Sequence, residues 1–145
     1  MIYVDTSYII KCYVNEPGTN AVLDFLERAP GRGAAIHART EFWSGIHRHL
    51  REENLNRKQT VEVWRQFGRD EENGLWHWLP LNEEVVRRSC AAFEALAESV
   101  FLRSADALHL ACAAVNGFTE IYSNDKRLLA AAGFFGLSAV NVIKS

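Results

Sequence analysis

The sequence has no long apolar run, no paired cysteines and no excess of basic charge. No segment approaches the roughly 18 consecutive apolar residues that a membrane-spanning helix needs. The three cysteines, Cys12, Cys90 and Cys112, are far apart and form no CxxC pair, which argues against a disulfide framework or a zinc knuckle. The net charge of -2 gives no overall positive field that would attract nucleic acid. A nucleic-acid ligand would therefore need a local basic patch or bound metal ions.

Several motifs for nucleotide and hydrolase chemistry are also missing. There is no Walker A lysine loop, no GxSxG elbow and no HExxH spacing among the five histidines. Gly31-Arg32-Gly33 begins like a dinucleotide fingerprint, but Ile36 stands at the third glycine position. We therefore expect no nucleotide cofactor and no serine nucleophile.

The size and composition are those of one globular domain, which we predict to span residues 1–145. Hydrophobic residues make up 48% and charged residues 23% of the chain, values typical of a packed core with a charged surface. The start of the chain is apolar but contains Asp5 and lacks a basic leader and a small-residue cleavage site. We interpret it as a strand and a helix rather than a signal peptide, and we expect a cytoplasmic protein with no membrane association.

Short β-prone runs alternate with helical patterns along the whole chain. This alternation predicts an α/β fold with a parallel sheet and helices on both faces. The predicted strands lie at residues 2–4, 34–37, 75–79, 119–122 and 139–143.

Acidic residues follow the predicted strands. Asp5 ends the first strand, Glu41 follows the second, and Asp125 comes just after residues 119–122. The C-terminal ends of parallel strands share one edge of the sheet, so these carboxylates can converge there. Asp106 lies in the first turn of its helix and can join them if that helix begins at the same edge.

Each acid also has a purely structural explanation. Asp5 could simply end a strand, Asp125 could cap a helix, and the helix dipole favours Glu41 and Asp106 in first turns. As a group, however, clustered carboxylates repel one another and raise one another's pKa. Mg²⁺ suits such an all-oxygen set. It can lower the pKa of a bound water and stabilise charge on a phosphodiester without a catalytic Ser, Cys or His.

These residues, in this order, resemble the PIN domain, and specifically the small toxin nucleases called VapC. The resemblance covers essentially the whole chain and rests on four motifs and a downstream Gly136-Leu137. The motifs are Ile2-Tyr3-Val4-Asp5-Thr6-Ser7, Glu41 with Arg48 two turns on, the run from Ser104 to Ala113, and Ser123-Asn124-Asp125-Lys126-Arg127-Leu128.

The resemblance implies a Rossmann-like sheet of about five parallel strands and a Mg²⁺- or Mn²⁺-dependent endoribonuclease. Asp5 and Asp106 would be metal ligands, whereas Glu41 and Asp125 would bind metal directly, bind it through water, or orient the attacking water. Thr6 and Ser123 would contact these acids without binding the metal themselves. The resemblance also implies a homodimer and a VapB-type antitoxin whose C-terminal tail enters the active-site groove.

Other residues near the motifs have two interpretations each. For His109, one helical step from Asp106, we favour a structural role, and the remaining histidines have no ligand spacing. Arg48 could contact phosphate or simply be solvated, and Arg103, beside the acids, is a candidate for a phosphate contact. We expect Trp43 and Trp64 at an interface, because aromatic residues are enriched there.

Two other functions are compatible with this kind of chain. The first is a PIN-like RNA-binding or interaction module that is catalytically silent, which the loss of an acid would favour, yet all four acids are present. The second is an aspartate phosphotransfer domain, but Ser7 stands where a haloacid-dehalogenase-like phosphatase needs a second aspartate. The phosphate analogue BeF₃⁻ would bind the phosphotransfer domain and leave the nuclease unaffected.

Overall fold

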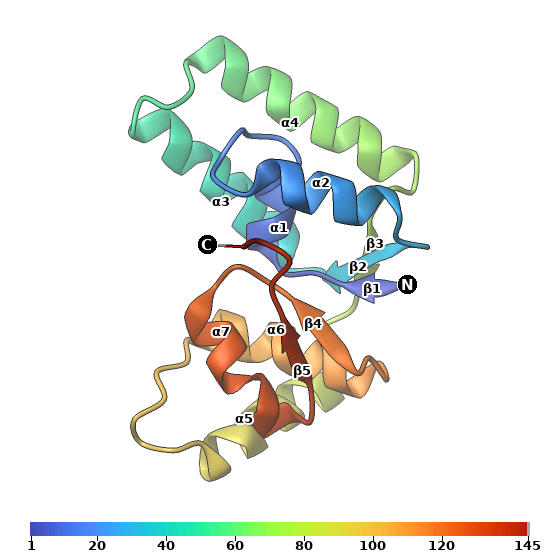
Figure 1. The fold of residues 1–145 in the computed structure, drawn as a ribbon, viewed down its shortest axis with the longest axis vertical. Helices are drawn as coiled ribbons and strands as arrows, with labels where there is room; N and C mark the ends of the chain where they lie inside the picture. Colours follow the sequence, from blue (N-terminus) through green and yellow to red (C-terminus); the bar gives the residue numbers. More distant parts are fainter. Residues whose placement is uncertain (145) are drawn as a thin grey trace.

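Strands and helices alternate in the computed structural model, which describes residues 1–144 (Figure 1). In chain order the elements are β1 (Ile2–Tyr3), α1 (Thr6–Lys11), α2 (Thr19–Glu27), β2 (Arg32–Ala35), α3 (Ala38–Arg51), α4 (Arg57–Glu72), β3 (His77–Leu79), α5 (Glu83–Ala95), α6 (Ser104–Val115), β4 (Glu120–Tyr122), α7 (Lys126–Ala131), a 3₁₀ turn (Ala132–Phe135) and β5 (Ser138–Val140).

All strand pairs in residues 1–144 are parallel. Strands β1, β2 and β3 pair in the order β1-β2-β3, and β4 pairs with β5. A single parallel bridge between Val4 and Tyr122, with a 3.1 Å hydrogen bond from the Asp5 N–H to the Tyr122 carbonyl, joins the two groups. The strand order is therefore β3-β2-β1-β4-β5, and the predicted parallel α/β architecture is confirmed.

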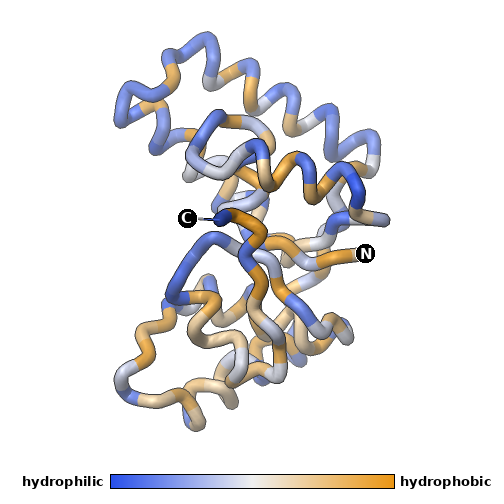
Figure 2. The backbone as a smooth tube through the Cα atoms, viewed as in Figure 1, coloured by the Kyte–Doolittle hydropathy of each residue, from blue (hydrophilic) through white to orange (hydrophobic). Residues whose placement is uncertain are grey.

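Alternation along the strands divides the apolar core between the two faces of the sheet. Tyr3 and Ala35 pack with α5, α6 and α7, whereas their neighbours Val4 and Ala34 pack with the helices from α1 to α4. Successive side chains of a strand point to opposite faces, which explains the split. Figure 1 shows the two helical groups on either side of the strands. Figure 2 shows that the outer helix α4 is mostly hydrophilic, as expected for a helix with one packed face.

The residues that begin the helices differ in whether they cap them. Asn56 begins α4 with a capping box to Gln59. Serine and threonine favour N-cap positions, which predicts Thr6 or Ser7 as the cap of α1 and Ser104 as the cap of α6. Both predictions are wrong: Asp5 holds the N-cap position of α1 and its carboxylate accepts other hydrogen bonds, and Arg103 holds that of α6 without a side-chain cap.

Within residues 1–144, no helix has the length and apolarity needed to cross a bilayer.

Candidate active site

The four predicted acids line one cavity of about 540 Å³ at the C-terminal ends of the strands. Each comes from a different part of the chain: Asp5 follows β1, Glu41 and Asp106 lie in the first turns of α3 and α6, and Asp125 precedes α7. The fold thus brings together residues up to 120 positions apart in the chain, from Asp5 to Asp125 (125 minus 5). Thr6, Arg48, Arg103 and His109 lie in the same cavity wall.

Asp5 is a buried carboxylate held by two serine hydroxyls. Ser7 Oγ donates to Oδ1 and Ser123 Oγ donates to Oδ2, both at 2.6 Å. The backbone N–H groups of Asn124 and Asp125 donate to these same hydroxyls, which directs the hydroxyl protons toward Asp5. Burial nevertheless raises the pKa of Asp5, because the ionised form is poorly solvated. A bound cation would remove that cost.

Glu41 is held through one oxygen only. Thr6 Oγ1 donates to Oε1 at 2.8 Å, and His109 Nε2 lies 2.6 Å from the same oxygen. Burial opposes ionisation of Glu41, but these hydrogen bonds and the nearby histidines outweigh it, so the pKa of Glu41 is lowered. Among the described residues, none bonds to Oε2, which leaves this oxygen for a ligand in the cavity.

Arg103 bridges Asp106 and Asp125. Its Nε lies 3.1 Å from Asp106 Oδ2, and its Nη2 lies 3.3 Å from Asp125 Oδ2. Burial raises the pKa of Asp106, although Arg103 partly offsets this. Asp125 also has the structural role considered above, since its Oδ1 accepts from the N–H groups of Arg127 and Leu128 at the start of α7.

Within residues 1–144, the only three potential metal-ligating groups that lie within 4.8 Å of one another are those of His37, Glu41 and His109. His37 Nε2 lies 2.9 Å from the Ala105 carbonyl, which can only accept, so this nitrogen carries a proton and is not free for a metal. Burial lowers the pKa of His37, which keeps the ring neutral near pH 7. The sequence analysis gave His37 no role at the site. Its i,i+4 spacing to Glu41 was the available indication that the two side chains lie close together.

The four carboxylates fit a hard divalent cation better than the histidines do. They supply only oxygen ligands, as Mg²⁺ and Mn²⁺ prefer. Two of them, on Asp5 and Asp106, are buried with raised pKa values, and the Arg103 guanidinium already places positive charge between Asp106 and Asp125.

Comparison with known proteins identifies the family of this chain. The PIN domain family profile matches residues 2–134. The chain belongs to the PIN domain family. Among solved structures, this PIN domain is similar to FitAcB from Neisseria gonorrhoeae, with a TM-score of 0.76, 17% identity and 98% of each chain covered. It is also similar to VapC20 from Mycobacterium tuberculosis, described as a sarcin-ricin loop cleaving toxin, with a TM-score of 0.71 and 15% identity over 95% of this chain and 99% of that one.

A third similar structure is FitAB bound to an IR36 DNA fragment, with a TM-score of 0.71 and 17% identity over 100% of this chain and 97% of the other. No curated protein sequence matches this PIN domain. At these identities the solved structures establish the fold.

The two predicted cationic residues, Arg48 and Arg103, both line the cavity but pair with different partners. Arg48 has a side chain that is 70% exposed and pairs at 3.1 Å with Glu52, the residue that follows α3, so it is a solvated residue that also lines the cavity. Arg103 pairs with two of the acids. Trp43 is exposed and stacks on Trp64, with ring centroids 4.5 Å apart. Their place at an interface stays a prediction.

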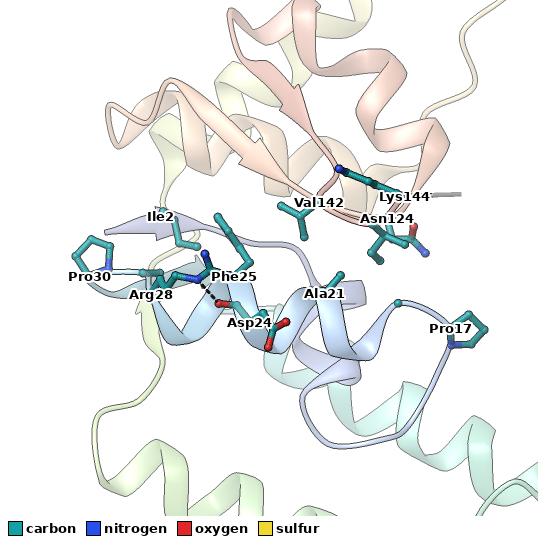
Figure 3. Close-up of a pocket in the computed structure, with 13 residues that line it drawn as sticks. Ile2, Pro17, Ala21, Asp24, Phe25, Arg28, Pro30, Asn124, Val142 and Lys144 are labelled. Carbon is teal, nitrogen blue, oxygen red and sulfur yellow. Dashed lines mark hydrogen bonds between the residues drawn. The ribbon is translucent and has the colours of Figure 1, made fainter.

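A larger groove of about 1030 Å³ lies between α2 and the C-terminal segment (Figure 3). Its walls are mainly apolar, with Ile2, Phe25 and Val142 among them, and Asp24 is its only acid. The Asp24 backbone carbonyl accepts from Arg28 Nε, and the groove contains no cluster of convergent polar groups. Within residues 1–144, the acidic cavity is therefore the better candidate for an active site, although it is smaller than this groove.

Proposed function

We propose that this PIN domain is a metal-dependent endoribonuclease that hydrolyses RNA phosphodiester bonds and acts as the toxin of a toxin–antitoxin pair. The observation that carries the proposal is the convergence of Asp5, Glu41, Asp106 and Asp125 from four elements into one cavity. Burial of ionised carboxylates without a cation is costly. A divalent cation bound among the four acids would offset this cost, and this favours a metal-dependent reaction.

The acids divide into two kinds by their surroundings. Asp5 and Asp106, buried and with raised pKa values, would hold Mg²⁺ or Mn²⁺ directly. When bound, the metal would lower the pKa of a water and stabilise charge on the scissile phosphate. Glu41, with a lowered pKa and a free Oε2, is suited to orient the attacking water, while Asp125 would complete the metal site.

Supporting residues would keep this geometry fixed. Ser123 holds Asp5, and Thr6 holds Glu41, each through a direct hydrogen bond. Arg48 and Arg103 lie at the cavity wall, where they would contact the phosphate backbone of a bound RNA. This local positive charge would offset the net charge of -2.

We further propose that the protein works in the cytoplasm as a homodimer held inactive by a VapB-type antitoxin. The similar fold of VapC20, described as a sarcin-ricin loop cleaving toxin, supports a toxin role. The exposed Trp43, stacked on Trp64, supplies an apolar surface suited to a protein partner. The family match over residues 2–134 agrees with one PIN domain in residues 1–145.

RNA cleavage by the purified protein tests the proposal. We expect cleavage with Mg²⁺ or Mn²⁺, none with EDTA, and losses of at least about 100-fold in Asp5→Asn and Asp106→Asn, as for removal of an essential catalytic interaction. The matched control is Asp24→Asn, which changes an exposed acid outside the acidic cavity.

Equal cleavage in all variants would indicate a contaminating ribonuclease and contradict the proposal. A protein free of antitoxin that cleaves no transfer, ribosomal or messenger RNA would favour the catalytically silent module instead.

A further inference from the structure

A chain of hydrogen bonds runs from the sheet to Glu41 through two buried side chains. The Ala35 N–H donates to Tyr3 Oη at 2.9 Å. Tyr3 Oη lies 2.7 Å from His109 Nδ1, and His109 Nε2 lies 2.6 Å from Glu41 Oε1. Tyr3 is 0% and His109 1% exposed, so neither side chain exchanges these partners for water.

Counting donors and acceptors fixes the protons along this chain. Tyr3 Oη already accepts from a backbone N–H, and burial raises the pKa of Tyr3 far above its usual value, so the phenol keeps its proton. His109 Nδ1 is the hydrogen-bond partner that can accept this proton. His109 Nε2 then carries a proton, which the Glu41 carboxylate accepts.

The other protonation states leave a buried group unsatisfied. A proton on His109 Nδ1 would point at Tyr3 Oη, which already accepts from the Ala35 N–H, and the Tyr3 proton would lose Nδ1 as its acceptor. The loss of this buried hydrogen bond is destabilising. Nε2 also needs a proton. Thr6 Oγ1 lies 3.3 Å from Nε2, but its hydroxyl already donates to Glu41 Oε1 at 2.8 Å. An unprotonated Nε2 would therefore face the carboxylate oxygen with no donor between them.

We propose that His109 is a positioning residue for Glu41, oriented by the Tyr3 hydroxyl at Nδ1 so that Nε2–H donates to Oε1. Its proton and the Thr6 hydroxyl hold Oε1, which leaves Oε2 directed at the cavity. A glutamate side chain without these two contacts would have rotamer freedom that must be lost when substrate binds. This inference rests on the proposed nuclease function for its consequence but not for its geometry.

Nitrogen NMR of the metal-free full chain, labelled with ¹⁵N-histidine at neutral pH, tests the geometry. His109→Gln identifies the two His109 resonances by their loss. We expect an unprotonated Nδ1 and a protonated Nε2 in the unaltered protein. In Tyr3→Phe we expect the Nδ1 resonance to shift, because this nitrogen loses its hydrogen bond. A proton on Nδ1, or on both nitrogens, would overturn the proposal whether or not the protein cleaves RNA.

Steady-state kinetics on the cleaved RNA, at saturating Mn²⁺, test the consequence. We expect His109→Leu to lower kcat about 10- to 100-fold, as for a misplaced reacting group, with KM within about 3-fold because RNA contacts are unchanged. His109→Gln should recover most of the rate, since its amide N–H can also reach Glu41.

Two controls separate positioning from stability. His77→Gln changes an exposed histidine on β3 and should leave kcat unchanged. Thermal unfolding should show each variant folded at the assay temperature. An unchanged kcat in a folded His109→Leu protein, or equal losses in the Leu and Gln variants, would refute a positioning role.

Discussion

Asp5 is a residue whose buried carboxylate destabilises the metal-free fold. Its carboxylate is 5% exposed, and burial raises its pKa. A carboxyl whose pKa is higher in the folded than in the unfolded protein destabilises the fold at pH values above that folded pKa. Without metal, the ionised Asp5 therefore lowers the free energy of unfolding.

Asp5→Asn should stabilise the metal-free protein. We expect a higher Tm for the variant, because it removes a carboxylate whose ionised form is poorly solvated in the folded protein. Mg²⁺ should raise the Tm of the unaltered protein and leave that of the variant unchanged. Thermal unfolding with and without Mg²⁺ measures both effects.

The same comparison has a predicted pH dependence. The advantage of Asp5→Asn should be complete at neutral pH and should disappear as the pH falls through the raised pKa of Asp5 toward about 4, the value in unfolded chains. Urea unfolding of both proteins between pH 7 and pH 4 measures it. An advantage that stays constant with pH would mean that the carboxylate charge is not its cause.

The Arg103 guanidinium lies between two acids of the proposed metal site, Asp106 and Asp125. Because its guanidinium pairs with Asp106 and Asp125, a metal ion must compete with it. Arg103→Gln should therefore strengthen Mn²⁺ binding by about two- to five-fold at low salt, the range of an exposed ion pair. Calorimetric titration without RNA measures this, and Arg48→Gln, whose partner is Glu52, is the control. Weaker Mn²⁺ binding in Arg103→Gln would contradict the prediction.

At the scale of elements, Asp125 joins a helix to the site. One oxygen caps α7 and the other faces Arg103. Asp125→Asn keeps a capping oxygen, so its stability should change by less than about 0.5 kcal/mol, whereas Asp125→Ala should lose about 1 kcal/mol with the cap. Both should lose metal-dependent cleavage, because both lack the charge. Denaturation and cleavage assays on the pair separate the two roles, and full activity in Asp125→Asn would remove Asp125 from the predicted metal site.

Exposed asparagines cap the helices that follow them. Asn56 and Asn82 both do so, because an exposed asparagine finds no better partner than the free N–H groups. Thr6 is instead the first residue of α1, after Asp5 at the N-cap position, and its hydroxyl donates to Glu41, 35 residues away. A contact that distant is not visible in local propensity.

At the scale of the whole molecule, the site lies where the two groups of strands meet. The bridge between Val4 and Tyr122 and the Asp5 N–H bond to Tyr122 are the only ladder contacts that join β1 to β4 in residues 1–144. Asp5 and Glu41 follow β1 and β2 of one strand group, and Asp125 follows β4 of the other. Asp106 lies in α6, which packs against both β2 and β4. A cation shared by these acids would tie the two sides together.

Hydrogen exchange should report this coupling. At a Mg²⁺ concentration ten times its Kd, the exchange of the Asp5 amide should slow roughly 10-fold, because metal binds only the closed form. NMR-detected exchange in the unaltered protein and in Asp106→Asn measures it. The same slowing in the variant, or none in the unaltered protein, would show that the metal does not span the junction.

The sequence by itself determined the alternation of strands and helices, the parallel sheet and the motifs that resemble the PIN family, because apolar periodicity, caps and short motifs are local. It also indicated that Asp5, Glu41 and Asp125 follow strands that share one edge. Only the tertiary structure decided the rest. Arg103 bridges two acids, and Tyr3 and His109, 106 residues apart, direct Glu41. Such contacts depend on how the helices pack across the sheet, and no local pattern encodes that packing.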